Sequence, residues 1–366
     1  MTGHAKHKTR VLLCTLNWGL GHATRDVPII RRLVDLGHEV ILAGDGAAME
    51  LLRIEFPELE IVYFRSLVRI RYSRHLPAWL KITLLSPMLL YEIIAEHYKL
   101  AGIIRKIRPS VVISDNRYGL WNRRVRSILI THQLSIRLPR FARFLEFPAY
   151  LVLRTFIRKF DRCWIPDYPG LANISGDLSH RYALPGNAVF IGALSRFDPF
   201  PGLSVQSSAK PVDLVILLSG PEPQRSKLQK IILIQVFALD ARCVILEGLP
   251  GRFKRVDLTS TVSTHSHLPA SELRNLIISA ENVICRAGYT GIMDLARMQK
   301  KALIVPTPGQ TEQEYLAGYL ASKGMFLTCS QDELDIVQAL EDLNQFNPVF
   351  NLPEERFLDM ELENLI

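Results

Sequence analysis

The chain has 366 residues, of which 48% are hydrophobic and 22% charged, a composition typical of a globular protein long enough for two domains. Its five cysteines lie far apart without a Cys-x-x-Cys pair, which disfavours a zinc site and a disulfide framework and favours the reducing cytoplasm. The basic N-terminus leads into only about eight apolar residues and has no small-residue cleavage site, so neither a signal peptide nor a spanning segment is expected.

The net charge of +8 is unevenly distributed along the chain. Residues 1–200 carry 29 Lys and Arg against 16 Asp and Glu, whereas residues 201–366 carry 15 against 20. A basic first half suits phosphate-bearing ligands or an anionic lipid surface. Nucleic acid is not an expected partner, because the basic residues are interleaved with Leu, Ile, Phe and Trp and no nucleic-acid-binding motif is present.

Short β-branched runs alternate with longer segments of helical spacing along the chain. The runs occupy 10–16, 39–44, 60–64, 110–115, 127–133, 212–220, 243–248, 282–288 and 302–308. This alternation predicts an α/β protein with two Rossmann-like, doubly wound domains that face a central cleft. The Pro-, Gly- and Ser-rich stretch 197–211 is the expected linker between an N-terminal domain (1–196) and a C-terminal donor domain (212–330). We expect helices over 331–366 and a return of these helices to the N-terminal domain.

The first polar bend, Asn17 to His22, follows the first strand. In open parallel sheets, ligands bind where strands end and the next helix presents unpaired N–H groups. Gly21 lets a ligand approach the main chain, and the positive end of the helix dipole favours a neutral imidazole on His22, as a general base requires. Two interpretations stay open for His22, a base or a helix cap.

Three polar residues follow later strands of the first domain on the same expected rim, Asp115, Asn116 and His132. We expect them to orient an acceptor, although a structural role for His132 is equally open. The segments 76–108 and 137–160 combine apolar faces with frequent Arg and Lys. They suit an anionic membrane surface, and the alternative is buried helices with snorkelling basic ends. The basic charge of this half favours the membrane surface.

A second polar bend, within 284–320, has the order strand, turn, helix, strand, polar loop, helix. Arg286, Gly288 and Thr290 stand where a helix would aim N–H groups at a diphosphate. Asp294, one turn on, has the acceptor oxygens that paired ribose hydroxyls require. The loop that follows contributes three side chains suited to sugar hydroxyls, Gln310, Gln313 and Glu314. The alternative is a capped helix followed by an ordinary polar loop.

These motifs resemble the donor site of the lipid-II-forming N-acetylglucosaminyltransferases, inverting GT-B enzymes with a family 28 C-terminal domain. The resembling residues are Cys285-Arg286-Ala287-Gly288 with Asp294, the pair Gln313-Glu314, and Asn17 to His22. The chain departs from that pattern in three ways: Asp294 replaces a usual Glu, Glu314 replaces a Gln, and the first bend has fewer glycines. The resemblance implies that His22 is the base, that Asp294 holds the ribose and that Gln313 and Glu314 contact the sugar. It also implies that Arg196, Ser219 and Gly220 hold phosphate and that backbone at Leu268 meets uracil.

The expected function is inverting transfer of a sugar, with N-acetylglucosamine as the candidate, from a UDP-sugar to a lipid-linked or other anionic acceptor. No Asp-x-Asp triplet occurs in the chain, so we expect neither a metal ion nor another cofactor. The enzyme is expected in the cytoplasm, on the inner face of the plasma membrane. Two alternatives stay open: a sugar-nucleotide epimerase of the same fold and a non-catalytic UDP-sugar-binding subunit.

Overall fold

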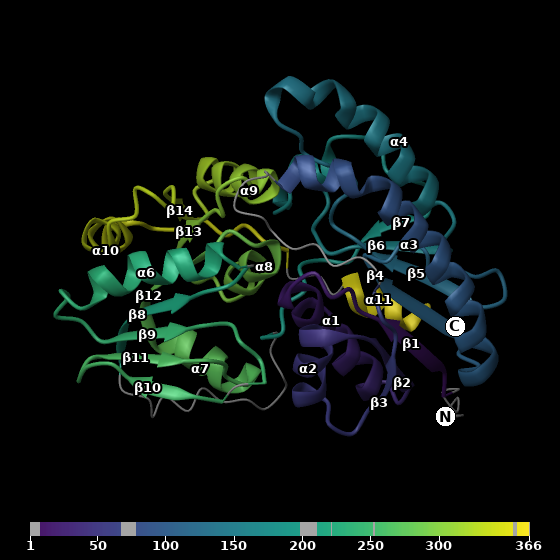
Figure 1. Cartoon of the computed structure of the whole chain (residues 1–366), viewed down its shortest axis with the longest axis horizontal. Helices are drawn as coiled ribbons and strands as arrows, with labels where there is room; N and C mark the ends of the chain where they lie inside the picture. Colours follow the sequence, from purple (N-terminus) through teal and green to yellow (C-terminus); the bar gives the residue numbers. More distant parts are fainter. Residues whose placement is uncertain are drawn as a thin grey trace.

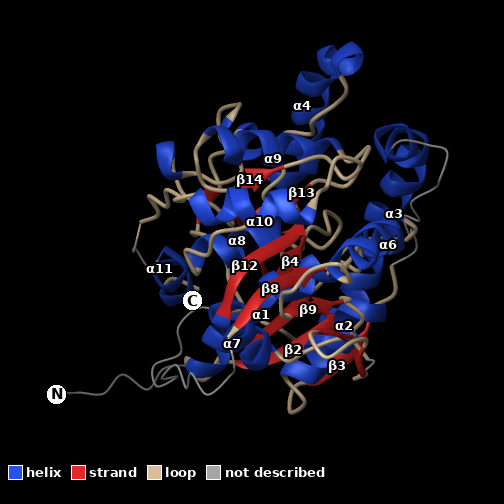
Figure 2. Cartoon of the chain, turned by 90° about the vertical axis from the view of Figure 1, so that its left-hand side faces the viewer, coloured by secondary structure: helices blue, strands red, loops and turns tan. Residues whose placement is uncertain are grey.

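Two parallel β-sheets, each with its own helices, form the framework of the chain (Figure 1). The computed structural model describes residues 8–66, 78–197, 211–220, 222–251, 253–353 and 357–365. Residues 198–210 of the expected linker lie outside the described residues. From the side, the strands lie in the middle and helices lie on either side of them (Figure 2).

The N-terminal sheet has the strand order β3-β2-β1-β4-β5-β6-β7, with every pair parallel. Its strands are β1 (Arg10–Cys14), β2 (Glu39–Gly44), β3 (Glu60–Tyr63), β4 (Val111–Asp115), β5 (Arg126–Ile130), β6 (Arg162–Ile165) and β7 (Ala188–Phe190). The central strands β1 and β4 are buried along almost their whole length, because helices cover both faces. This double coverage explains why these strands are apolar runs rather than alternating patterns.

Helices of the first domain pack on opposite faces of that sheet. Leu33 and Leu52 pack with Val11 on one face, whereas Leu100 packs with Leu12 on the other. The helices are α1 (Leu20–Asp35), α2 (Gly46–Glu55), α3 (Ala78–Ile107), η1 (Arg140–Leu145), α4 (Glu146–Ile157), η2 (Gly170–Ala172) and α5 (Asp177–His180). Within the described part of the chain, no helix is long and apolar enough to cross a membrane.

The C-terminal sheet has the order β10-β11-β9-β8-β12-β13-β14, and only the pair β10–β11 is antiparallel among the described strands. Its strands are β8 (Val212–Leu217), β9 (Cys243–Leu246), β10 (Arg255–Asp257), β11 (Val262–His265), β12 (Ala280–Arg286), β13 (Leu303–Val305) and β14 (Leu327–Thr328). Its helices are α6 (Gln224–Val236), α7 (Ala270–Ser279), α8 (Tyr289–Arg297), α9 (Thr311–Ser322) and α10 (Ile336–Gln345). The architecture of two doubly wound sheets is therefore the one expected from the sequence.

The last helix, α11 (Phe357–Glu363), leaves the second domain and packs on the first (Figure 1). Asp359 accepts a hydrogen bond of 2.6 Å from Arg32 Nε, and Glu361 accepts one of 2.9 Å from Trp164 Nε1. In contrast, α10 stays with the second domain, where Leu343 belongs to the same core as Ile216. The expected return of helices from 331–366 thus applies to α11 and is wrong for α10.

The two domains share one continuous hydrophobic core. It joins Val11 and Ile30 of the first domain to Val215 and Ile292 of the second. Helices α1 and α8 meet at this junction, so their N-termini, which follow the two polar bends, lie side by side. The fold therefore brings together two motifs that are separated by more than half of the sequence.

Candidate active site

A cavity of about 140 Å³ lies between the domains, at the carboxyl ends of the central strands. The first domain contributes Gly21 and Thr24 of α1, and the second contributes the start of α8. Among the residues that the sequence singles out, these line the cavity: Gly21, Arg196, Ser219, Leu268, Arg286, Gly288, Thr290 and Asp294. The two polar bends therefore form one site.

The helix N-termini of the two domains touch at this cavity. Gly288 precedes the first turn of α8, and Thr290 Oγ1 donates a hydrogen bond of 3.0 Å to the carbonyl oxygen of Gly21. The first N–H groups of a helix have no partner within the helix and carry partial positive charge. The start of α8 is consequently suited to bind an anion in the cavity.

Asp294 lies on the cavity wall and contacts the segment that leaves the first domain. Its Oδ1 accepts hydrogen bonds from Ser195 Oγ at 2.8 Å and from the backbone N–H of Arg196 at 3.2 Å. The guanidinium of Arg196 forms an ion pair with Oδ2 at 3.3 Å. The residue expected to bind ribose thus also fixes the end of the first domain against α8.

Arg286 is almost completely buried beside the cavity, and burial lowers its pKa to about 10. It donates 2.9 Å and 2.6 Å hydrogen bonds to the carbonyl oxygen of Gln224 and to Gln331 Oε1. Among the buried polar atoms of the cavity lining, Arg286 Nε and His267 Nε2 have no hydrogen-bond partner in the described residues. A buried polar atom without a partner is costly, so such atoms favour a polar ligand in the cavity.

The remaining donor-site candidates do not line this cavity. Gln313 Oε1 accepts from the backbone N–H of Thr307 at 2.9 Å, and Glu314 Oε1 accepts from that of Gly309 at 2.8 Å. Gln310 precedes the first turn of α9, and Gly220 takes a φ of +95° in the turn after β8. In this structure Gln313 and Glu314 therefore stabilise the loop before α9, instead of reaching the cavity.

A buried group of charged side chains adjoins the cavity on the first-domain side. His22 Nδ1 lies 3.1 Å from Asp115 Oδ2, and Arg25 Nε donates 2.9 Å to the same oxygen. Burial alone would raise the pKa of Asp115, but the Arg25 charge and the hydrogen bonds from His22 and Arg25 together outweigh it and lower the pKa to about 2. The Asp115 carboxylate is therefore ionised and directed at His22.

The candidates for acceptor binding have other contacts than expected. Asp115 has no exposed surface and its oxygens face Arg25 and His22, so any effect on the orientation of an acceptor would pass through these side chains. Asn116 Oδ1 accepts from Thr131 Oγ1 at 3.1 Å. His132 is buried, stacks on Tyr289 at 4.2 Å, and places Nε2 3.0 Å from Glu312 Oε1. His132 is therefore part of the contact between the domains.

Arg25, Asp26 and Glu312 were not among the site residues expected from the sequence. Arg25 and Asp26 follow His22 by three and four residues, so helical geometry places all three on one face of α1. Burial, together with the Asp115 charge, raises the pKa of Asp26 well above its ordinary value, and Thr15 Oγ1 donates to Asp26 at 2.6 Å. Their spacing of three and four residues from His22 was the sequence feature that could have pointed to Arg25 and Asp26.

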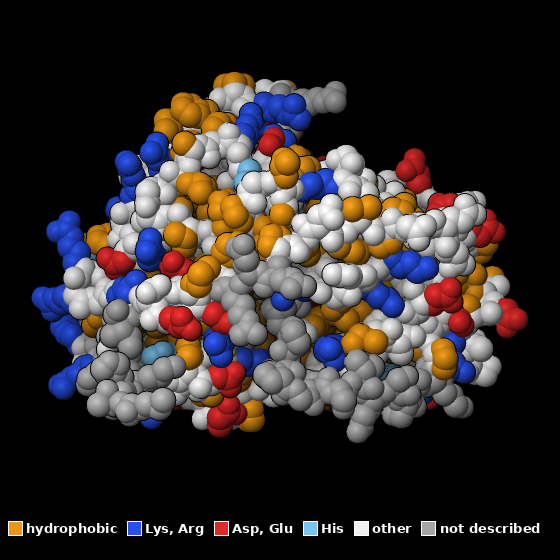
Figure 3. Space-filling view, turned by 180° about the vertical axis from the view of Figure 1, so that it is seen from behind, with side chains coloured by type: hydrophobic (Ala, Val, Ile, Leu, Met, Phe, Trp, Pro, Cys, Tyr) orange, Lys and Arg blue, Asp and Glu red, His pale blue; other side chains and the backbone are white. Residues whose placement is uncertain are grey.

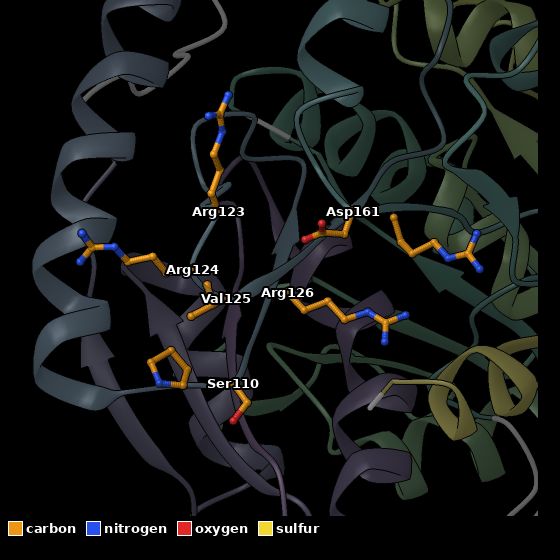
Figure 4. Close-up of a pocket in the computed structure, with 8 residues that line it drawn as sticks. Ser110, Arg123, Arg124, Val125, Arg126 and Asp161 are labelled. Atoms are coloured by element: carbon orange, nitrogen blue, oxygen red, sulfur yellow. The ribbon is translucent and has the colours of Figure 1, made fainter.

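A second, open depression of about 700 Å³ lies at the amino ends of β4, β5 and β6, away from the site (Figure 4). Four arginines surround it: Arg123, Arg124, Arg126 and Arg162. It contributes to the basic character of the first domain. In the described residues, no three His, Cys, Asp or Glu side chains are grouped as metal ligands.

Residues 260–357 match the model of the glycosyltransferase family 28 C-terminal domain. A protein of Methanosarcina acetivorans described as an uncharacterized glycosyltransferase is 24% identical over 336 residues, which cover 86% of this chain and 84% of that protein. The chain is a GT-B glycosyltransferase. Its fold is similar to that of the glycotransferase of kitacinnamycin, with a TM-score of 0.62 at 15% identity over 98% of this chain and 94% of that chain.

The glycosyltransferase VinC, solved in complex with DTDP, has a similar fold with a TM-score of 0.54 at 15% identity, over 97% of this chain and 94% of that chain. The family 28 match of this GT-B glycosyltransferase begins just before β11 and includes Gly288, Thr290 and Asp294. His22, Arg25 and Asp115 lie outside the matched residues. The match therefore covers most of the second-domain wall of the cavity, and the buried charged group belongs to the other domain.

Proposed function

We propose that this glycosyltransferase transfers a sugar, with inversion and without a metal ion, from a UDP-linked donor to a lipid-linked or other anionic acceptor. The observation that carries the proposal is the meeting of the two polar bends, Gly21 and Gly288, at one cavity. A helix N-terminus from one domain and a histidine-bearing bend from the other are the parts that a displacement at a sugar diphosphate requires.

The lining of the cavity suits a nucleoside diphosphate. Its apolar part, with Leu217, Leu273 and Ile277, suits a base, and the unpartnered Nε2 of His267 can hydrogen-bond to it. The N-terminus of α8 and Arg196 suit the diphosphate. The complex of VinC with DTDP supports a pyrimidine nucleotide here. N-acetylglucosamine, the sugar implied by the resemblance, is the first donor sugar to test.

His22 and Asp115 suit the chemical step. With its proton on Nδ1, donated to ionised Asp115, His22 has an unprotonated Nε2 that can accept the proton of an acceptor hydroxyl. The acceptor oxygen then bonds to the anomeric carbon while the bond from that carbon to the diphosphate oxygen breaks. The α8 N-terminus and Arg196 stabilise the negative charge that develops on the departing UDP.

The acceptor is proposed to be presented at a membrane surface, the inner face of the plasma membrane. The described parts of α3, η1 and α4 expose large apolar side chains: Tyr91, Ile94, Tyr98, Phe141, Phe144, Phe147 and Val152. Hydrophobic and basic side chains gather on this projecting part of the molecule (Figure 3). Aromatic groups beside basic ones suit the interface of an anionic bilayer.

A nucleotide sugar needs more room than the structure provides. Ligand sites usually measure about 300–1,000 Å³, whereas this cavity measures about 140 Å³. The hydrogen bond between Thr290 and Gly21 joins the two domains at this cavity. We therefore propose that the domains separate to admit the donor and close again around it.

A thermal-shift series tests the donor class. UDP, UDP-N-acetylglucosamine, GDP and dTDP are added separately to the purified protein, and the uridine ligands are expected to raise the melting temperature most. A larger shift with dTDP or GDP would mean that the donor carries that nucleotide instead of UDP. The absence of a shift with every ligand would contradict the proposal. Turnover of UDP-N-acetylglucosamine into an epimer without an acceptor would support the epimerase instead.

A further inference from the structure

The contacts of Arg25 extend beyond the pair His22–Asp115. Its guanidinium is fully buried, donates from Nε and Nη2 to the two oxygens of Asp115, and places Nη2 3.0 Å from His22 Nδ1. Its remaining nitrogen, Nη1, lies 3.0 Å from His132 Nδ1. One rigid, planar group thus contacts a carboxylate and both imidazoles.

The chemistry of Arg25 decides the proton position on His132. A guanidinium has only donors, so His132 Nδ1 must accept and carries no proton. The proton of a neutral His132 is then on Nε2, which lies 3.0 Å from Glu312 Oε1 and donates to it. Burial lowers the pKa of His132, and Arg25 adds to this effect while Glu312 opposes it, so the imidazole is neutral.

Glu312, which belongs to the second domain, accepts this hydrogen bond from His132 of the first domain. Its other oxygen, Oε2, accepts from Gln133 Nε2. Burial would raise the pKa of Glu312, but the hydrogen bond from His132 and the nearby positive charge, including that of Arg25, together outweigh it, so the pKa is lowered and the group is an ionised acceptor. Glu312 is in the first turn of α9, which follows the loop that Gln313 and Glu314 stabilise. The chain of contacts therefore leads from Asp115 to the donor domain.

Arg25 also affects His22, which is the proposed base. His22 Nδ1 faces both oxygens of Asp115, at 3.2 and 3.1 Å, as well as Arg25 Nη2. Nδ1 can either accept from Arg25 Nη2 or, when it carries a proton, donate to Asp115; only in the second case can Nε2 of the neutral ring accept a proton. By pairing with both oxygens, Arg25 keeps Asp115 ionised and fixed as the acceptor for that proton.

We propose that Arg25 is a positioning residue that sets the proton position on His132, holds Asp115 beside His22 and, through His132 and Glu312, links the base to the donor domain. The role of His22 as base rests on the proposed function, whereas the proton position on His132 does not. Arg25 does not line the cavity, so its effect on donor binding should be small.

Nitrogen NMR of protein labelled with ¹⁵N-histidine tests the proton positions directly. Resonances are assigned with His22→Gln and His132→Gln. In the wild type we expect protonated Nε2 on His132, whereas a base at His22 requires protonated Nδ1 on that ring. In Arg25→Lys, a single ammonium cannot serve Asp115 and His132 together, so the His132 signals should move toward a mixture of both tautomers. Protonated Nδ1 on His132 in the wild type, or unchanged signals in Arg25→Lys, would overturn the proposal.

Glu312→Gln provides a second variant with Arg25 intact. Its amide oxygen can still accept from His132, so His132 should keep its proton on Nε2. A switch of the His132 tautomer in Glu312→Gln would show that Glu312 sets it, which would overturn the proposal even if Arg25→Lys does not fold.

Calorimetry of UDP binding and measurements of turnover distinguish a positioning role of Arg25 from a role in donor binding. Arg25→Lys should bind UDP within about twofold of the wild type, while kcat for UDP release from UDP-N-acetylglucosamine should fall about 10²-fold, the lower end of general-base effects. A fall in UDP affinity with unchanged kcat would overturn the proposal. Failure of the wild type to bind UDP would contradict the proposed function and leave the NMR result valid.

Discussion

His22 lies at the start of α1, and its Nδ1 contacts the buried carboxylate of Asp115. We predict that His22→Ala lowers turnover by about 10²- to 10⁴-fold, the contribution of a positioned general base. UDP affinity should stay close to that of the wild type, because Gly21 and not His22 lines the cavity. UDP-release kinetics and calorimetry measure the two effects, with His265→Ala in β11 as the matched control. Unchanged turnover would exclude His22 as the base.

Asp294 holds the end of the first domain and, by our proposal, the ribose. We predict that Asp294→Ala weakens UDP binding by about 1–3 kcal/mol, the effect of a lost charged hydrogen-bond partner. Ser195→Ala removes one donor to Asp294 and should leave UDP affinity equal or higher, because Oδ1 becomes more available. Calorimetry on both variants decides this point. Equal losses in the two variants would mean that Asp294 only fixes the domain junction.

The raised pKa of Asp26 makes the stability of the folded protein depend on pH, and it also fixes the direction of that dependence. Because burial and Asp115 raise its pKa in the folded state, the folded protein binds more protons than the unfolded chain between the two pKa values. Stability therefore falls as pH rises above about 4, the ordinary pKa of Asp, until the raised value is passed. We predict that the melting temperature of Asp26→Asn falls less between pH 5 and pH 8 than that of the wild type. Parallel curves would contradict this account.

At the scale of elements, the sequence predicted what depends on local pattern. Apolar runs identified central strands such as β1 and β4, and glycines after strands identified both bends. Strands β6, β7, β10, β11 and β14 were missed, because two to four residues carry too little periodicity. The contact of Glu312 with His132 was missed because it joins residues 180 positions apart. Contacts of this kind depend on how the domains pack.

The helices η1 and α4 form the element for which we predict membrane contact. Phe141 and Phe144 of η1 are 69% and 75% exposed. Burial of a phenylalanine is worth about 1.5–3 kcal/mol, so Phe141→Ser with Phe144→Ser should reduce binding to phosphatidylglycerol vesicles at least about tenfold. Cosedimentation measures the effect, and Ile234→Ser in α6 with Phe237→Ser just after it is the matched control. Equal binding by both double variants would contradict membrane contact through η1.

For the whole molecule, the central claim is that the donor binds between the domains. A side chain at Gly21 would place its Cβ 3.7 Å from Thr290 Cβ, within the range of about 3.5–4.5 Å for a disulfide. The combined change Gly21→Cys and Thr290→Cys should therefore fix the domains in their closed arrangement when oxidised. The native cysteines interfere little, because all but Cys329, which is half-buried, are buried.

Calorimetric titration of UDP into the oxidised and the reduced form of this double variant is the most direct test. The two forms have the same sequence, so each is the control for the other. We predict that the reduced form binds UDP and that the oxidised form does not, because the cavity cannot open. Equal affinity in the two forms would place the nucleotide outside the space between the domains and contradict the account.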